Sequence, residues 1–93
     1  MPGIQELQWD EENEAHIARH GVAIEEVEDL CFGPHWALRA KGGRRRALYG
    51  QTAGGRYLLA ILESVGRGVY RPVTARDMTD RERRRYRLSR GGR

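Results

Sequence analysis

The chain has 93 residues, 39% hydrophobic and 32% charged, with one cysteine and a net charge of +4. A chain of this length buries only about 60–65% of its unfolded surface, which predicts one small domain over residues 1–93 and excludes a second. The charge is divided: residues 1–34 hold nine acidic groups and one basic group, whereas residues 35–93 hold sixteen basic and four acidic groups. One part of the chain therefore repels phosphate and the other attracts it.

A short strand and then a helix are predicted at the start of the chain. Residues 4–9 alternate apolar and polar side chains, which is typical of a strand with one buried face. Asp10 then occupies a helix N-cap position, and glutamates follow in the first turn, where the helix dipole favours negative charge. We expect this helix to run to about Arg19 and to end at Gly21, a suitable C′ residue.

A second helix is predicted over residues 23–32, where the apolar side chains recur on one face. Gly33-Pro34 ends the pattern. Cys31 lies on the apolar face without a second cysteine, so we expect a buried core thiol and not a nucleophile. Because the sequence shows no disulfide pattern, no leader and no long apolar run, a cytoplasmic protein is expected.

The chain from residue 35 to residue 76 is predicted to form an antiparallel sheet. The extended segments are residues 35–41, 44–52, 56–65 and 69–76. Short connections with glycine separate them, which is typical of hairpins. The third segment is almost continuously apolar and so belongs at the sheet centre, while Pro72 in the fourth indicates an edge position or a bulge. The predicted fold class is α+β, with two N-terminal helices on one face of a meander and a basic C-terminal helix.

The last helix is marked by its start and by its arginines. Thr79 and Glu82 form a capping box, in which each side chain accepts the backbone N–H of the other residue. The helix carries Arg81, Arg83, Arg84, Arg85, Arg87 and Arg90. Tyr86 is its main apolar group and is expected to anchor it by packing, so most of the helix faces water or a polyanion. Residues 89–93 are expected to form a flexible tail.

Three histidines are candidates for chemistry. His16 and His20 lie four residues apart on the first predicted helix, and Asn13 can share their face. Such a pair can bind zinc with His35 as a third ligand, but the helix lacks the glutamate of an HExxH motif and no cysteine accompanies it. No metal and no cofactor is therefore predicted. His20 also suits a structural role at the helix end, and His16 suits an exposed or packed position.

Arg76 stands where the last strand meets the capped helix. It can form an ordinary salt bridge with Asp77, Asp80 or Glu82. Alternatively, it can bind a scissile phosphate together with Arg56 and Arg71 from adjacent strands. The residues alone leave both interpretations open.

Aromatic side chains offer two further possibilities. The Tyr86 hydroxyl can reach a phosphate or take part in proton transfer, in addition to packing. Trp9 and Trp36 are most simply core or sheet-edge residues, although either can stack a base if it is exposed.

Two segments resemble a known family. WDEENEAHIARHGVAIEEVEDL and VTARDMTDRERRRY are similar to the BrnT family of bacterial type II toxins, whose fold resembles that of RelE-like ribonucleases. The resemblance covers about residues 7–88 and keeps the order of parts, from the His-Gly-Val helix end to the Thr-x-x-Glu-Arg-x-x-Tyr ending. It implies RNA cleavage without a metal and neutralisation by a cognate antitoxin, commonly a BrnA-like DNA-binding protein.

Carried over by position, the resemblance places Arg56 and Arg76 in an RNA site, with His20 and Tyr86 as nearby catalytic candidates. Better-known members carry lysines where this chain has Asn13 and Arg19. Arginine stays protonated near neutral pH and is a poor general base, so other groups must transfer protons. The candidates for proton transfer are His16, His20, Glu82 and Tyr86, and the candidates for RNA binding are Arg71, Arg83, Arg84, His16 and Glu82.

The sequence therefore predicts an mRNA-cleaving toxin in which a ribose 2′-OH attacks the adjacent phosphate in line. The ribose would supply the nucleophile, and the arginines would neutralise the charge of the phosphorane. The expected partners are RNA and the antitoxin, in a dimer or higher complex, and no membrane. The alternative is a non-catalytic nucleic-acid or partner-binding module whose basic helix binds phosphates.

Overall fold

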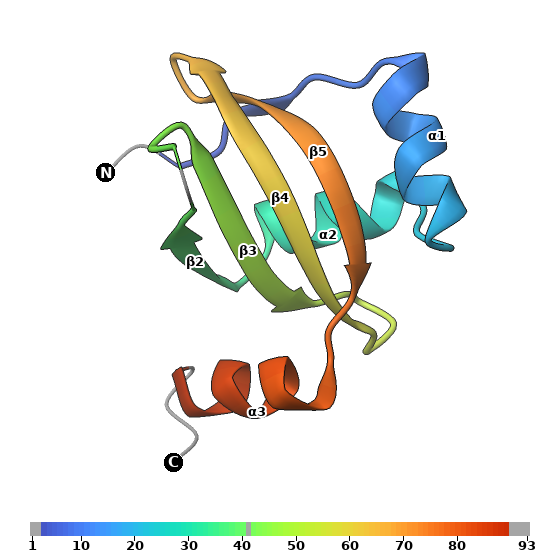
Figure 1. The fold of residues 1–93 in the computed structure, drawn as a ribbon, viewed down its shortest axis with the longest axis vertical. Helices are drawn as coiled ribbons and strands as arrows, with labels where there is room; N and C mark the ends of the chain where they lie inside the picture. Colours follow the sequence, from blue (N-terminus) through green and yellow to red (C-terminus); the bar gives the residue numbers. More distant parts are fainter. Residues whose placement is uncertain (1–2, 41, 90–93) are drawn as a thin grey trace.

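The computed structural model describes residues 3–40 and 42–89, which form an α+β fold with helices on both faces of a sheet (Figure 1). The elements are β1 (Glu6–Leu7), α1 (Glu11–Arg19), α2 (Ile24–Phe32), β2 (His35–Arg39), β3 (Arg45–Gln51), β4 (Tyr57–Gly66), β5 (Val69–Asp77) and α3 (Asp80–Ser89). The strand order across the sheet is β1-β5-β4-β3-β2. The predicted fold class is therefore confirmed.

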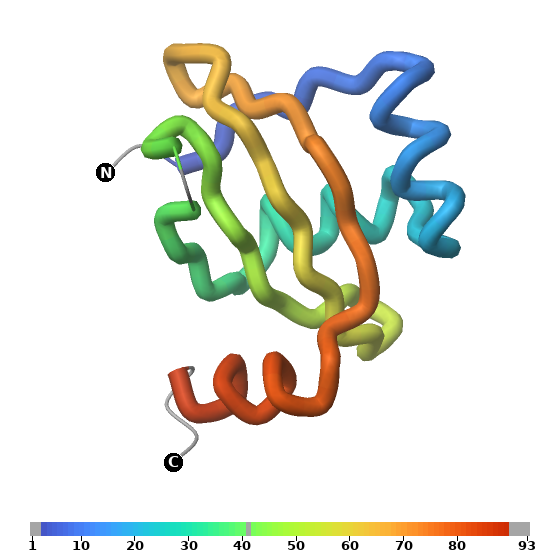
Figure 2. The backbone as a smooth tube through the Cα atoms, in the orientation of Figure 1, coloured from blue at the N-terminus to red at the C-terminus, as the bar shows by residue number. Residues whose placement is uncertain are grey.

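The strands β2 to β5 form the predicted antiparallel meander, whose path can be followed in Figure 2. β4 lies at the centre of the sheet, as its apolar sequence predicted. β1 is shorter than the strand predicted over residues 4–9, because it spans only two residues, and it pairs in parallel with β5. The chain leaves β5 soon after Leu7 to reach the Asp10 cap of α1, which keeps β1 short.

Pro72 is accommodated by a bulge, at a point of β5 that β1 does not reach. β5 lies between β4 and β1, and its register with β4 shifts between Thr74 and Pro72. Val73 is therefore the extra residue of a bulge beside the proline, which cannot donate to the ladder. Beyond the end of β1, the Asn13 side chain donates to the Pro72 carbonyl at 3.1 Å.

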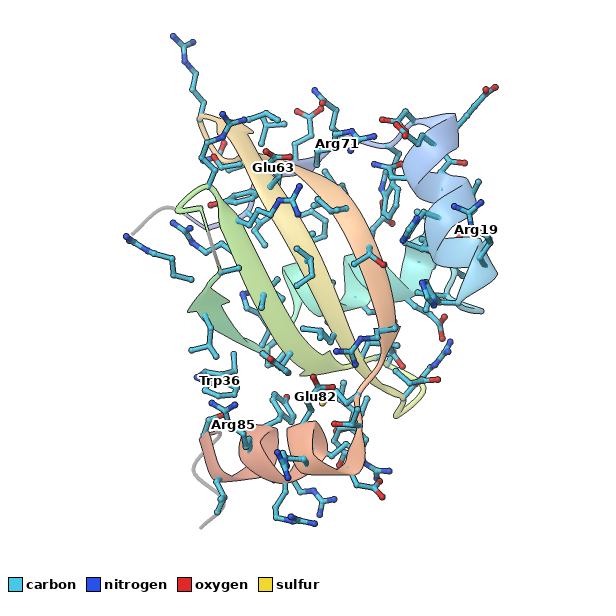
Figure 3. The ribbon with its side chains drawn as sticks, viewed as in Figure 1. Arg19, Trp36, Glu63, Arg71, Glu82 and Arg85 are labelled. Atoms are coloured by element: carbon cyan, nitrogen blue, oxygen red, sulfur yellow. The ribbon has the colours of Figure 1, made fainter. Side chains whose placement is uncertain are left out.

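Asp10 caps α1 as predicted, within a capping box that the sequence analysis missed. The Asp10 carboxylate accepts the Asn13 N–H at 2.8 Å, and the Asn13 side-chain oxygen accepts the Asp10 N–H at 2.9 Å. Asn13 is only 2% exposed and so has a structural role in the helix start. At the other end, Arg19 lies on the outer side of the last turn (Figure 3), and Gly21 has the expected positive φ of 72°.

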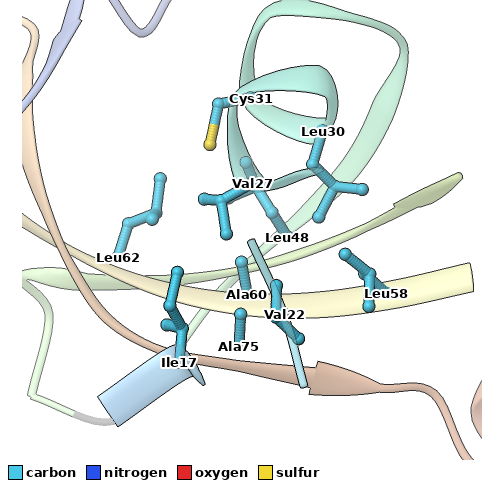
Figure 4. Close-up of a cluster of buried hydrophobic side chains, with 10 residues drawn as sticks. All are labelled: Ile17, Val22, Val27, Leu30, Cys31, Leu48, Leu58, Ala60, Leu62 and Ala75. Atoms are coloured by element: carbon cyan, nitrogen blue, oxygen red, sulfur yellow. The ribbon is translucent and has the colours of Figure 1, made fainter. Parts of the chain in front are cut away.

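The main hydrophobic core lies between the sheet and the two N-terminal helices (Figure 4). Its buried side chains are Ile17, Val22, Val27, Leu30, Cys31, Leu48, Leu58, Ala60, Leu62 and Ala75. Cys31 is buried as predicted, and burial raises the pKa of its thiol to about 12. The thiol is therefore inert at neutral pH.

α3 covers only one end of the opposite face, across the lower part of the sheet in Figure 1. Ala47, Leu59, Met78 and Tyr86 form a smaller buried cluster beneath it. Tyr86 is 6% exposed and is the packing anchor that the sequence predicted. Ser89 is the last residue of α3 and does not begin a tail, because its side chain bonds back to the helix; residues 90–93 lie outside the described residues.

Among the described helices, none is long and apolar enough to cross a membrane.

Candidate nucleic-acid interface

A row of four side chains crosses the face of the sheet that α3 partly covers. Trp36 of β2 pairs with Tyr49 of β3. Tyr49 in turn pairs with Leu59 of β4, and Leu59 pairs with Arg76 of β5. Because cross-strand partners share a face, these side chains form one line, which we call the sheet row. Three strand spacings separate its two ends, about 14 Å.

Arg76, at one end of the sheet row, is held by the start of α3. Its guanidinium donates to the two Glu82 oxygens at 2.8 and 3.0 Å and to the Asp77 carbonyl at 3.0 Å. Glu82 also accepts the Thr79 N–H at 2.9 Å, and the Thr79 hydroxyl accepts the Glu82 N–H at 3.1 Å, so the predicted capping box is confirmed. Arg76 is the largest of the causes that lower the pKa of Glu82 to about 2.

Arg76 keeps N–H groups for a further ligand. A guanidinium has five N–H donors in a planar fork, and three of those of Arg76 make the bonds just described. The Arg76 side chain is 42% exposed. A phosphate can therefore bind the remaining edge of the guanidinium while Glu82 holds it, although the carboxylate charge opposes that binding.

Arg56 lies on the other face of the sheet, where it connects the end of β5, the start of α2 and the turn that follows α1. It donates to both Asp77 oxygens at 2.7 and 3.3 Å, to the Gly21 carbonyl at 2.8 Å and to Glu26 at 2.9 Å. Neighbouring residues of a strand point to opposite faces, so Asp77 and Arg56 lie toward α1 and α2 while Arg76 lies toward α3. The structure thus does not bring Arg56 to Arg76 as the sequence analysis expected.

A cavity of about 290 Å³ lies between Arg56 and α3 at this end of the sheet. Its lining residues are Gly55, Arg56, Tyr57, Asp77, Met78 and Arg83. The Arg83 guanidinium carbon is 4.3 Å from the Tyr57 ring centroid, which is a close cation–π contact. The Arg83 Nε is buried and has no hydrogen-bond partner within residues 3–40 and 42–89. Arg56 and Arg83 of the basic helix thus line the same cavity.

The arginines of α3 differ in their partners from Arg56, Arg71 and Arg76. Arg56, Arg71 and Arg76 each bind a carboxylate. In the described part of the chain, no such ion pair is found for Arg81, Arg83, Arg84, Arg85 and Arg87. Two of them extend the contacts with aromatic rings, since Arg85 lies 5.7 Å from the Trp36 centroid and Arg87 lies 5.8 Å from that of Tyr57. Figure 3 shows Arg85 beside Trp36.

Three other predicted site residues lie on β5 and α1: Arg71 belongs to β5, His16 to α1, and His20 is the C-cap residue of α1. Arg71 donates to Asp10 at 2.9 Å and to Glu12 at 3.2 Å, and Figure 3 shows it at the end of the sheet opposite Glu82. The rings of His16 and His20 lie 5.5 Å apart. None of the three belongs to the sheet row, so their roles in RNA binding or catalysis stay predictions.

His35 is oriented by the end of α2. Its Nδ1 donates to the carbonyls of Leu30 and Gly33, each at 3.0 Å. Within the described ranges, no group of three or more His, Cys, Asp or Glu side chains is placed to hold a metal ion.

The sequence analysis missed the tyrosines of this surface. Tyr49 contacts Trp36 with ring centroids 5.2 Å apart, and Tyr57 packs edge-on against Tyr86 at 6.1 Å. The alternation within β3 already separates Tyr49 from the core residue Leu48. Only the register with β4 and β5, however, places Tyr49 on the same face as Arg76.

Two N-terminal helices on one face of a mostly antiparallel sheet, with a capped basic helix on the other, define a BrnT- or RelE-like α+β fold. The crystal structure of the Brucella abortus ribonuclease toxin BrnT is similar to this structure, with a TM-score of 0.65. The match covers 81% of this chain and 97% of that chain at 20% sequence identity, which confirms the predicted resemblance in fold. No protein-family model and no curated protein sequence matches this chain.

Proposed function

We propose that this protein is a ribonuclease toxin of a type II toxin–antitoxin system and that it cleaves mRNA without a metal ion. The observation that supports this best is the sheet row beside the basic α3, on the fold of a protein described as a ribonuclease toxin. Guanidinium groups bind phosphates and aromatic rings stack bases, so this surface suits single-stranded RNA. Arg83 and Arg84 of α3 would hold the RNA backbone.

The proposed reaction is in-line attack of a ribose 2′-OH on the adjacent phosphate. The 2′ oxygen bonds to phosphorus while the bond to the 5′ oxygen breaks, which leaves a cyclic phosphate and a 5′-hydroxyl. Arg76 stabilises the charge that develops on the phosphorane, and this is the step at which a fixed donor contributes most. Glu82, whose pKa is about 2, is ionised at neutral pH and mainly holds Arg76 in place.

Proton transfer is assigned to α3 in this proposal. The 2′-OH must lose a proton and the 5′ oxygen must gain one. Tyr86 is the candidate on α3 besides Glu82, and it lies in the cluster beneath the helix. Arg56 is proposed to position the end of β5 through Asp77, and thereby Arg76. His20, the C-cap residue of α1, has no assigned step.

The test is cleavage of an RNA oligonucleotide by the purified protein in EDTA. Cleavage should occur, and a single deoxyribose at the cleaved nucleotide should abolish it because the nucleophile is then missing. Arg76→Ala should lower the cleavage rate about 10²–10³-fold while RNA affinity is mostly kept. Arg81→Ala, which removes the same charge from an exposed position of α3, is the control. Persistent cutting of the deoxyribose substrate would eliminate this chemistry.

A second function, a non-catalytic nucleic-acid-binding module, is favoured by one observation. Arg56 and Arg76 both bind carboxylates, so the charges of the two arginines first expected in the RNA site are already compensated. In that case α3 alone would bind RNA, with a steep dependence on salt and no cleavage. Arg76→Ala would then lower the affinity for RNA only in part. Neither the wild type nor the variant would cleave RNA.

The partner that accompanies the proposed function is a BrnA-like, DNA-binding antitoxin, and the complex, a dimer or higher assembly, would act in the cytoplasm. Co-expression with a short DNA-binding protein encoded beside this gene tests this part. A stable complex in which RNA cleavage is lost is the expected result, and full cleavage in its presence would contradict the proposal.

A further inference from the structure

The end of the sheet row opposite Arg76 combines an aromatic ring with a cation that has no carboxylate partner within residues 3–40 and 42–89. Trp36 is partly exposed on the edge strand β2, and one side of it packs against Tyr49. Arg85 of α3 is exposed and lies over the ring at 5.7 Å. α3 thus spans the row, with Glu82 at the Arg76 end and Arg85 at the Trp36 end (Figure 3).

Two of the three arginine–aromatic contacts of α3 differ in distance and in exposure. Arg83 lies 4.3 Å from the Tyr57 centroid and its Nε is buried, so that contact belongs to the packing of the helix. The Arg85–Trp36 contact is more than 1 Å longer, at 5.7 Å, and has an exposed guanidinium. A ligand can therefore approach this second pair without disturbing the anchor of α3.

We infer that Trp36 and Arg85 form a base-binding subsite, in which an unpaired base stacks on Trp36 and Arg85 covers the base or binds its phosphate. This rests on the proposed function for the identity of the ligand as single-stranded RNA. The subsite lies about 14 Å along the sheet row from Arg76, so the stacked base belongs to a nucleotide close to the one that is cut and not to the cut nucleotide itself. Stacking of this kind tolerates any base and requires an unpaired one.

The test uses the fluorescence of Trp36. Trp9→Phe makes Trp36 the only tryptophan, and a mixed-sequence 2′-O-methyl RNA oligonucleotide serves as the probe because it lacks the attacking hydroxyl. Trp36 emission should change on binding of the single strand and much less on binding of an RNA duplex. An abasic position moved along the probe should abolish the change at one place only, which locates the stacked nucleotide.

Substitutions distinguish stacking of a base on Trp36 from electrostatic attraction between arginines and phosphates. Trp36→Leu should weaken binding about 5- to 150-fold with an unchanged salt slope, and Trp36→Phe should restore most of the affinity. Arg85→Ala should reduce the emission change, whereas Arg81→Ala, with the same loss of charge from α3, should leave it intact. Circular dichroism would show whether Trp36→Leu keeps the fold. The emission change is measured in the protein that retains Trp36, so it tests the subsite even if Trp36→Leu does not fold.

The possible failures can be distinguished. RNA cleavage with unresponsive Trp36 emission would overturn the base-binding subsite and leave the ribonuclease standing. A Trp36 response to RNA without any cleavage would keep the subsite and overturn the ribonuclease. Absence of RNA binding would overturn both.

Discussion

Asn13 joins the start of α1 to the bulge of β5 with a single side chain. Its amide donates to the carbonyls of Gln8 and Pro72 at 3.0 and 3.1 Å, and its oxygen accepts the Asp10 N–H at 2.9 Å. Because Asn13 is buried, water cannot replace these hydrogen bonds if the side chain is removed. Asn13, which the sequence placed on the same helix face as the candidate histidines, therefore has a structural role.

Asn13→Ala should lower the free energy of unfolding by roughly 2–4 kcal/mol, because it leaves several polar groups without partners. Asn13→Asp should also be destabilising, since a carboxylate cannot donate to two carbonyls. Urea unfolding followed by circular dichroism measures both. Glu14→Ala, at an exposed position of the same helix, should change the stability by less than about 1 kcal/mol. Equal effects of Asn13→Ala and Glu14→Ala would contradict the role given to Asn13.

At the scale of the elements, two helices begin in the same way. Glu26 accepts the Ala23 N–H at 3.0 Å at the start of α2 and binds Arg56 at 2.9 Å. Glu82 accepts the Thr79 N–H at the start of α3 and binds Arg76. Each helix start is thus attached to the sheet through a capping glutamate and an arginine. Since α3 has few apolar side chains, this attachment matters most for α3.

Glu82→Gln should destabilise the protein in a pH-dependent way. The pKa of Glu82 in the folded protein, about 2, lies below its ordinary value of 4.5, so the carboxylate contributes stability above about pH 4.5. This contribution is lost as the pH falls toward 2. The wild type should therefore be more stable than the variant by roughly 1–3 kcal/mol near neutral pH, and the difference should vanish toward pH 2.

The Glu82→Gln variant separates charge from capping. The amide oxygen of the introduced glutamine can still accept the Thr79 N–H, so only the pair with Arg76 is weakened. Asp80→Asn removes a charge from the same turn without touching Arg76, and it should have little effect. Denaturant unfolding at several pH values compares the three proteins. A stability difference for Glu82→Gln that does not change with pH would argue against the ion pair.

At the scale of the whole molecule, the division of charge in the sequence becomes a division between faces. The acidic helices α1 and α2 cover one face of the sheet, and the basic α3 lies on the other. The carboxylates of Glu26, Asp10 and Glu12 compensate Arg56 and Arg71, whereas the five arginines of α3 have no carboxylate partner among the described residues. An RNA strand should therefore bind on the α3 side of the sheet.

The dependence of RNA binding on salt tests this orientation. Each phosphate contact contributes about 0.7 to the slope of log K against log salt concentration for a single strand. Arg84→Gln with Arg87→Gln should lower the magnitude of the slope by up to about 1.4, whereas Glu25→Gln with Glu28→Gln on α2 should leave it unchanged. Fluorescence anisotropy with a labelled 2′-O-methyl RNA measures both slopes. A larger change of the slope in the α2 variant would indicate that RNA binds on the side of α1 and α2, which contradicts the expected orientation.

The sequence by itself determined the elements, because their signals are local. Thr79 and Glu82 mark the start of α3, Gly21 marks the end of α1, and the apolar residues 57–62 mark the central strand. Each depends on backbone geometry or periodicity within a few residues. The division of charge was equally visible, since it needs only a count along the chain.

Only the tertiary structure decided which groups meet. The sequence offered Arg76 three carboxylates, and the packing of α3 on the sheet selected Glu82. The sequence analysis also expected Arg56 beside Arg76, but Arg56 binds Asp77 and Glu26 on the other face of the sheet. The alignment of Trp36 with Arg76 depends on the register of four strands. Such contacts join residues far apart in the chain, and no local pattern records the register that brings them together.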